Sequence, residues 1–140
     1  MSQPSTAVAC LTYRDPQAAI DWLCSVFGFE RHVVYTDNDG SVQHAELTFG
    51  SGMIMLGGVR DTPYGQLVRL PQQIQGCVTQ SVYIVTTTPD AIYAKAKEQG
   101  ARIVIDIKDE DYGSRGFTCA DPEGHLWSFG TYDPWSAKTQ

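Results

Sequence analysis

The chain lacks the features that mark several common classes of protein. Its 140 residues contain no apolar run of membrane-spanning length and no basic, apolar, cleavable segment near the start. We therefore expect a cytoplasmic protein with no membrane partner. Its 4 cysteines include no CxxC pair, which argues against a zinc knuckle or a redox motif and fits reduced thiols in the cytosol.

Positive charge is also in short supply. The chain has 10 Lys and Arg residues against 16 Asp and Glu, for a formal net charge of -6. This balance argues against a nucleic-acid partner, which needs a basic face. It would help to attract a cationic small molecule, although many proteins are acidic simply for solubility. A hydrophobic share of 42% predicts one globular domain over residues 1–140.

The main positive feature is an internal repeat at a shift of 73 residues. It aligns YRDPQAAIDWLCSVFGFE near the start with TTTPDAIYAKAKEQGARI after the midpoint, so that Pro16 maps onto Pro89 and Leu56 onto Phe129. A unit of this length is too small to bury a core alone. We therefore expect the two units to pack against each other and to form a ligand site in the cleft between them.

Local patterns predict the same order of elements, βαβββ, in both units. The elements are expected at 8–13, 15–28, 33–36, 42–49 and 53–56 in the first unit, and at 81–85, 88–100, 101–107, 115–120 and 125–130 in the second. This order divides the chain into module one at about 7–57, a connector at about 58–78, module two at about 79–132 and a C-terminal tail at 133–140. The connector has room for one helical turn and is a candidate lid over the site.

The first predicted helix has clear start and stop signals. Asp15 is the expected N-cap, Pro16 occupies the first helical position, and Gly28 ends the helix. Apolar residues follow at helical spacing, namely Ala19, Ile20, Leu23, Val26 and Phe27. This stripe predicts a helix with one buried face.

The doublet of βαβββ units resembles the vicinal oxygen chelate superfamily, which includes glyoxalase I, bleomycin-resistance proteins and extradiol dioxygenases. The most telling segments are LTYRDPQAAIDWLCSVFGF at the front and YGSRGFTCADPEGHLWSFGTY at the back. The second segment looks especially like the glyoxalase/bleomycin-resistance branch. The resemblance implies an α+β fold in which two tandem βαβββ modules form a curled sheet around a cleft, and commonly a homodimer.

The resemblance also implies where a metal would bind. In metal-dependent members, each module presents one ligand on its first strand and one on its last, and the ion polarises the paired oxygens of the substrate. Carried over on the RDP and DPEG turns and the TPDA helix start, these positions fall on Val8, Met55, Ser81 and Ser128. Valine has no donor, a serine hydroxyl is a weak one, and a thioether prefers soft ions. We therefore expect no metal and no other cofactor, with a non-standard divalent site left open.

His44 and Glu46 are the candidates for such a site or for catalysis. On the predicted strand they alternate with Ala45 and Leu47, which should pack on the helices, so His44 and Glu46 share the face toward the cleft. A His–Glu pair could act as an acid–base couple or contribute two metal ligands. The alternative is a solvated strand face on which the two merely pair. For metal binding we favour this alternative, because no third ligand is visible.

Further candidates for ligand contact come from both modules. Strand parity and the superfamily positions give Cys10, Thr12, Met53, Met55, Ser81, Tyr83 and Ser128. Arg115 could bind a carboxylate or phosphate in bidentate fashion, or could tie a loop to Asp121 or Glu123, which we favour. Trp135, in the tail, could cap the cleft or pack across a dimer interface.

Two functions from different classes remain. The first is a binding protein that sequesters a drug, such as an antibiotic, or a metabolite in a metal-free cleft, as resemblance to bleomycin-resistance proteins implies. Methionine and aromatic side chains suit a flat ligand, and the overall acidity suits a cationic one. The second is a glyoxalase-type lyase or isomerase acting on an oxygenated small molecule, with Glu46 and His44 as acid–base groups or as non-standard metal ligands. Because none of the residues at the four superfamily metal positions is a good metal ligand, we favour the binding protein over the enzyme.

Overall fold

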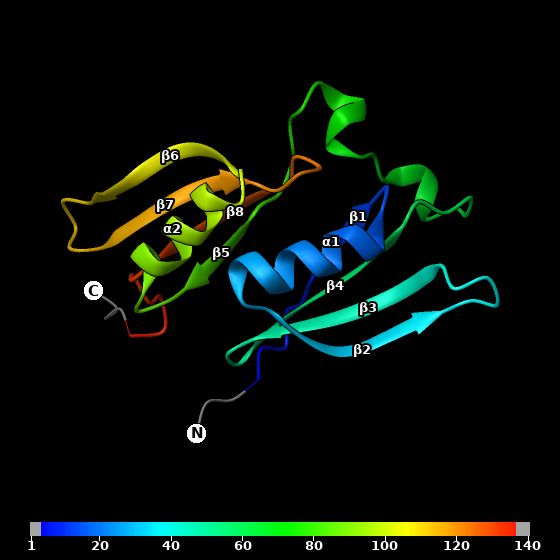
Figure 1. Ribbon diagram of the computed structural model, residues 1–140, viewed down its shortest axis with the longest axis horizontal. Helices are drawn as coiled ribbons and strands as arrows, with labels where there is room; N and C mark the ends of the chain where they lie inside the picture. The colour runs from blue at the N-terminus through cyan, green and yellow to red at the C-terminus, as the bar shows by residue number, and fades with distance from the viewer. Residues whose placement is uncertain (1–3, 137–140) are drawn as a thin grey trace. The chain divides into compact units, whose positions relative to one another are not determined.

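The computed structural model describes residues 4–136 and shows the order βαβββ twice (Figure 1). The chain divides into two compact units, the first ending at Gln75 and the second beginning at Gly76. The division therefore falls within the predicted connector. The last four residues of the predicted tail 133–140 lie outside the described residues. In the part of the chain that is described, no helix is both long and apolar enough to cross a membrane.

The first unit contains a four-stranded mixed sheet in the order β1-β4-β3-β2. Its strands are β1 (Ala9–Tyr13), β2 (Glu30–Thr36), β3 (Val42–Phe49) and β4 (Gly52–Gly58). β1 runs parallel to β4, and the other neighbours are antiparallel. The parallel partners β1 and β4 are joined by a long connection that contains the helical stretch, β2 and β3, as a parallel pairing requires.

That helix, α1 (Pro16–Trp22), begins where the sequence predicts, and a further helical segment continues the stretch to the predicted end at Gly28. The Asp15 carboxylate accepts a hydrogen bond from the Ala18 amide at 3.1 Å. Gly28 ends the helical stretch in the left-handed conformation, with φ 89°, which glycine adopts without steric cost. All five predicted apolar residues are buried. One feature was not predicted: the second half of the stretch, η1 (Leu23–Phe27), is π-helical.

The second unit repeats the plan with a sheet in the order β5-β8-β7-β6. Its elements are β5 (Val82–Val85), α2 (Pro89–Glu98), β6 (Arg102–Asp109), β7 (Arg115–Ala120) and β8 (Leu126–Gly130). The core includes Phe117 and Phe129, whose rings stack with centroids 5.3 Å apart. Two four-stranded mixed sheets with a helix in each unit confirm the predicted α+β class.

The pairing of strands reproduces the sequence repeat residue by residue. Cys10 lies opposite Met55 in β1–β4, and Tyr83 lies opposite Ser128 in β5–β8. Each of these positions is 73 residues from its counterpart. The shift of 73 is therefore a structural register as well as a sequence pattern.

The turn DPEG between β7 and β8 is organised by a buried carboxylate. Asp121 is only 4% exposed. Its Oδ1 accepts hydrogen bonds from the Glu123 and His125 amides at 3.0 and 3.1 Å, and its Oδ2 accepts one from the Trp127 indole at 3.0 Å. The carboxylate therefore fixes both the turn and the largest core side chain of the second unit.

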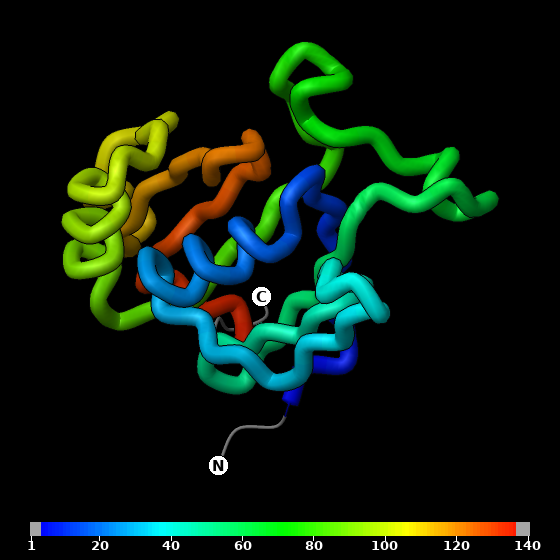
Figure 2. Tube along the Cα trace, turned by 45° about the vertical axis from the view of Figure 1, so that its right-hand side comes forward, coloured from blue at the N-terminus to red at the C-terminus, as the bar shows by residue number. Residues whose placement is uncertain are grey.

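The connector of the first unit is a long excursion after β4, drawn in green in Figure 2. It contains two short 3₁₀ turns, η2 (Gly65–Leu67) and η3 (Pro71–Ile74), where the sequence predicted room for one helical turn. The Gln73 side chain accepts a hydrogen bond from the Leu70 amide at 2.7 Å and so closes the second turn. These local bonds give the connector a defined course without strand or helix periodicity.

Candidate functional site

One face of the first sheet gathers most of the site residues predicted in module one. Cys10, Met55 and Glu46 lie side by side across β1, β4 and β3. Thr12, His44 and Met53 stand two residues from these along their strands, so they share the same face. The opposite face carries the buried residues Ala45, Leu47, Ile54 and Leu56, and α1 contacts β1, β3 and β4. The predicted alternation of His44 and Glu46 with Ala45 and Leu47 is thus confirmed.

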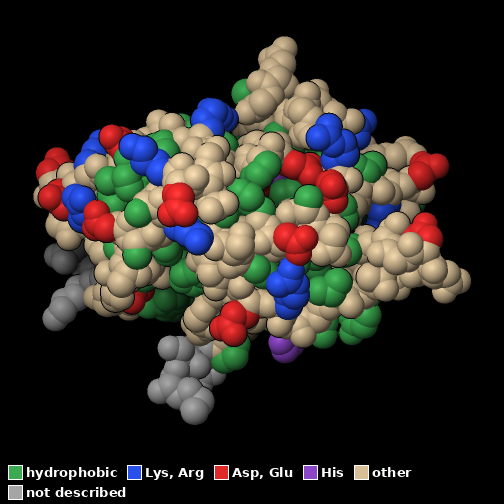
Figure 3. Space-filling view, in the orientation of Figure 1, with side chains coloured by type: hydrophobic (Ala, Val, Ile, Leu, Met, Phe, Trp, Pro, Cys, Tyr) green, Lys and Arg blue, Asp and Glu red, His purple; other side chains and the backbone are tan. Residues whose placement is uncertain are grey.

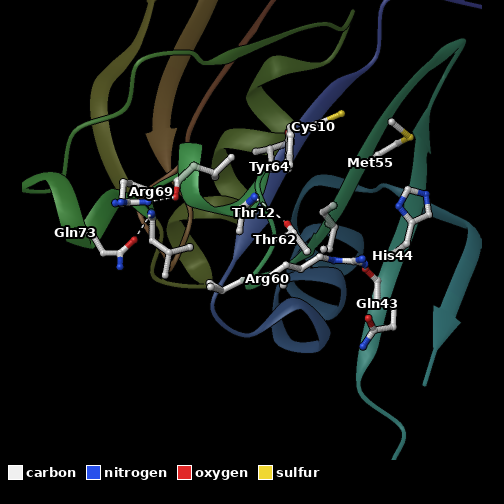
Figure 4. A pocket seen from close by; sticks show the side chains of 18 residues that line it. Cys10, Thr12, Gln43, His44, Met55, Arg60, Thr62, Tyr64, Arg69 and Gln73 are labelled. Carbon is white, nitrogen blue, oxygen red and sulfur yellow. Dashed lines mark hydrogen bonds between the residues drawn. The ribbon is translucent and has the colours of Figure 1, made fainter. Parts of the chain in front are cut away.

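A pocket of about 560 Å³ lies over this face, between the sheet and the connector (Figure 4). Its sheet side includes Cys10, Thr12, His44 and Met55, four of the predicted site residues. Met53 and Glu46 share the face but are not among the lining residues. All of the lining residues belong to the first unit. A cavity of this size falls within the range of about 300–1,000 Å³ that is typical of small-molecule sites.

The connector supplies the other wall of the pocket with Arg60, Thr62, Tyr64, Arg69 and Gln73. None of these was predicted to bind ligand, although the connector itself was predicted as a lid. The Arg60 guanidinium reaches β3 and donates a hydrogen bond to the Gln43 carbonyl (Figure 4). The Thr62 hydroxyl accepts a hydrogen bond from the Gly65 amide at 3.0 Å. The connector is therefore fastened to the sheet that it covers.

Gly57 makes this arrangement possible. A Cβ at this position would lie 2.8 Å from the Gln43 carbonyl oxygen, the atom that accepts the hydrogen bond from Arg60. Real Cβ atoms do not approach backbone atoms so closely, so a side chain at Gly57 would displace β3 and remove the acceptor. The glycine is thus required by close approach rather than by an unusual backbone angle.

His44 and Glu46 form a hydrogen-bonded pair on β3. The His44 Nε2 and Glu46 Oε2 atoms are 2.8 Å apart, and the two side chains are 35% and 25% exposed. The His44 ring also stacks against Tyr35, with centroids 6.1 Å apart. Because His44 lines the pocket and Glu46 does not, the histidine is the group that can touch a ligand. The carboxylate can fix its orientation.

The remaining predicted residues belong to the second unit. The Tyr83 hydroxyl donates to the Tyr132 carbonyl at 2.8 Å, and burial raises the pKa of the Tyr83 phenol. The Ser128 and Thr118 hydroxyls are hydrogen-bonded at 2.7 Å. Ser81 is exposed immediately before β5, and the Trp135 side chain is 96% exposed. Tyr83 and Ser128 lie on strands of the second sheet as predicted, whereas Ser81 lies just before β5 and not within it.

Arg115 is a structural tie, as favoured, but its partners were wrongly predicted. Its guanidinium binds the Asp90 carboxylate through two hydrogen bonds of 2.9 Å and also contacts Asp109 at 3.3 Å. The hydrogen bonds to Asp90 raise the pKa of Arg115, and they lower the pKa of Asp90 in turn. Asp121 cannot be the partner, because Arg115 begins β7 and Asp121 follows its last residue, about 20 Å along an extended strand.

The residues at the superfamily metal positions do not fit a divalent cation. Val8 offers no donor, Met55 offers a thioether, and the Ser128 hydroxyl already bonds to Thr118. Within residues 4–136, no group of three or more His, Cys, Asp and Glu side chains is placed to hold a metal ion. The donor set therefore disagrees with the metal chemistry of the metal-dependent members.

The same four-stranded mixed sheet with a helix occurs twice in the chain, and each time the first strand runs parallel to the fourth. This arrangement defines a tandem βαβββ protein. The chain belongs to the Glyoxalase/Bleomycin resistance protein/Dioxygenase superfamily, whose family model matches residues 6–129. The predicted superfamily membership is therefore confirmed.

Individual relatives agree with this assignment. The crystal structure of TioX from Micromonospora sp. ML1 is 32% identical and has a TM-score of 0.70, over 90% of this chain and 97% of that one. A lactoylglutathione lyase from Agrobacterium tumefaciens is 19% identical with a TM-score of 0.62, over 96% and 100% of the two chains, which shows the fold alone. An uncharacterized protein from Mycobacterium tuberculosis (strain H37Rv) is 28% identical over 120 residues, which are 86% of this chain and 70% of the relative.

Proposed function

We propose that this protein binds a small organic molecule in the pocket of the first unit, without a metal, and so sequesters it. The observation that carries the proposal is the cavity of about 560 Å³ between the sheet face and the connector. Pockets of this size with apolar walls and a few polar groups are the usual sites of small ligands.

The chemistry of the walls supports a ligand with an apolar or aromatic part. Apolar contact comes from both sides of the pocket, through Met55, Val59, Tyr64, Val68 and Leu70. Met55 is flexible and polarizable, so it adapts to ligands of different shape. The Tyr64 ring offers a face for stacking. Membership of a superfamily whose name includes bleomycin resistance supports sequestration of a drug or metabolite.

Two tryptophan substitutions on β4 test the proposal. Met55 and Met53 are the same residue type, on the same strand and face, but only Met55 lines the pocket. Met55→Trp should fill part of the cavity and abolish the thermal stabilisation that bound molecules give in a screen of aromatic drugs and metabolites. Met53→Trp should leave that stabilisation unchanged. Equal responses from the two variants would contradict a binding site in this pocket.

Metal independence needs its own measurement. Protein purified without chelator should contain less than a stoichiometric amount of nickel, zinc, iron and manganese by elemental analysis. The reason is that Val8, Met55 and Ser128 are poor donors for such ions. A stoichiometric metal that is lost in a His44→Ala variant would show a site at the His–Glu pair and overturn the metal-free proposal.

A second candidate function is metal-free acid–base catalysis by a glyoxalase-type lyase or isomerase. It is favoured by the 2.8 Å bond between His44 and Glu46, with His44 at the pocket wall. A carboxylate that orients a histidine is a common arrangement for a general base. In this case Glu46→Gln should abolish turnover of an oxygenated substrate while ligand binding and the melting temperature are kept. Binding without turnover in the wild type would leave sequestration as the function.

The homodimer implied by the superfamily resemblance stays a prediction. Analytical ultracentrifugation of the purified chain measures it directly, since a dimer has twice the mass of 15.4 kDa. Sedimentation at the monomer mass over the micromolar range would contradict it.

A further inference from the structure

The pocket has a charge opposite to that of the chain. Its lining includes the guanidinium groups of Arg60 and Arg69, and no Asp or Glu is among the lining residues. The whole chain carries 16 acidic against 10 basic residues. On the face shown in Figure 3, acidic and basic side chains are intermixed. The pocket walls therefore concentrate positive charge on an acidic protein, which is the reverse of what the net charge alone suggests.

Neither pocket arginine is neutralised by a carboxylate among the residues that the structure describes. Arg60 donates to the Gln43 carbonyl, and Arg69 donates through Nη1 to the Gln66 and Val68 carbonyls, both at 2.9 Å. Elsewhere the chain does pair arginines with acids: Arg31 lies 2.6 Å from Asp21. A guanidinium has five N–H donors, so both pocket arginines retain donors for a ligand.

We propose that the ligand carries a negatively charged oxygen group, a carboxylate or a phosphate, which binds the Arg60 guanidinium. This inference rests on the proposed binding function and specifies its ligand class. The guanidinium fork matches both oxyanions in a bidentate geometry. Figure 4 shows the Arg60 side chain extending toward Gln43, the neighbour of His44 on β3, and His44 also lines the pocket. Arg69 adds positive potential from the connector wall.

Affinities of matched naphthalene probes test the inference. The series consists of 2-naphthoate, 2-naphthyl phosphate, the neutral 2-naphthamide and the cation 2-naphthylmethylammonium, which share one apolar body. Calorimetric titration at low salt should show an anion bound about tenfold more tightly than the amide, a difference of about 1.4 kcal/mol. The preference should shrink as sodium chloride is added. The better of the two anions distinguishes a carboxylate from a phosphate ligand.

Arginine substitutions then locate the preference. Arg60→Gln should remove most of the preference for the anion, and Arg69→Gln should reduce it. The matched control is Arg102→Gln, on an exposed position of β6 in the second unit, which should change nothing. Melting temperatures measured without probe verify that all three variants fold.

The possible results separate this inference from the function on which it rests. Equal binding of anion, amide and cation would refute anion recognition and leave the pocket's binding function intact. A uniform loss of affinity for all probes in Arg60→Gln would show that the residue only fastens the connector, which also refutes recognition. No binding of any probe to the wild-type protein would contradict the proposed function and the inference together.

Discussion

Replacing Asp121 by alanine should destabilise the second unit more than any surface substitution. The change leaves three N–H donors without their acceptor: the amides of Glu123 and His125 and the indole of Trp127. A buried donor without a partner costs about 1–3 kcal/mol. The two amides lie in a half-exposed turn that water can reach, so they contribute at the lower end, whereas the indole is fully buried. The expected total is about 3–5 kcal/mol, a large part of a typical stability of about 5–15 kcal/mol.

Urea denaturation followed by far-UV circular dichroism measures this loss as a change in the free energy of unfolding. Asp121→Asn is the informative second variant, because its amide oxygen can still accept from the turn while its NH₂ group faces the indole donor. It should lose less than the alanine variant. Asp111→Ala, at an exposed position, serves as the control and should change stability by less than about 0.5 kcal/mol. A loss below about 1 kcal/mol for Asp121→Ala would refute the assigned role of the carboxylate.

Three further predictions concern single side chains. Because Arg115 lowers the pKa of Asp90, the pair stabilises the fold above the unfolded pKa of about 3.9 and loses this effect as pH falls through the lower folded pKa. Asp90→Asn should therefore lower the melting temperature at neutral pH, and by progressively less as the pH is lowered below about 3.9. A shift in melting temperature that does not depend on pH would contradict the pairing. Burial raises the pKa of Cys119 to about 12. Iodoacetamide added to the folded protein should therefore modify the exposed Cys10 and spare Cys119, as measured by mass spectrometry. Rapid modification of both thiols would show that Cys119 is accessible. Asp15→Ala should cost about 1 kcal/mol in urea denaturation through loss of the helix cap, with Asp15→Asn close to the wild type, and a neutral alanine variant would argue against capping.

The architecture could be predicted because its signals are local. Asp15, Pro16 and Gly28 mark the ends of one helical stretch through their own backbone preferences, and the repeat at 73 carries that reading into the second unit. The π-helical segment Leu23–Phe27 and the second 3₁₀ turn were missed. Both depend on how a stretch packs against the rest of its unit, which a local pattern does not encode.

Site residues could be predicted only in strands, where the side chains alternate regularly between the two faces of the sheet. Alternation along the strands placed Cys10 and His44 on one face, and the structure puts both in the pocket. Arg60 and Arg69 were missed because the connector has no period from which the direction of a side chain follows. Their charge was the one available signal, and it was hidden by the acidity of the whole chain. The partner of Arg115 was missed for a related reason, since contacts between a strand and a helix start depend on tertiary structure.

Because the two units share one register, each position in the first unit has an equivalent position in the second with which it can be compared. Met55 and Ser128 occupy equivalent places, opposite Cys10 and Tyr83 respectively. The same substitution can be made at Met55 in one variant and at Ser128 in another. An effect on the stability of the βαβββ scaffold should then be seen in both variants, whereas an effect on ligand binding in the pocket should be seen only at Met55. The duplication therefore allows the second unit to serve as a control for substitutions made in the first.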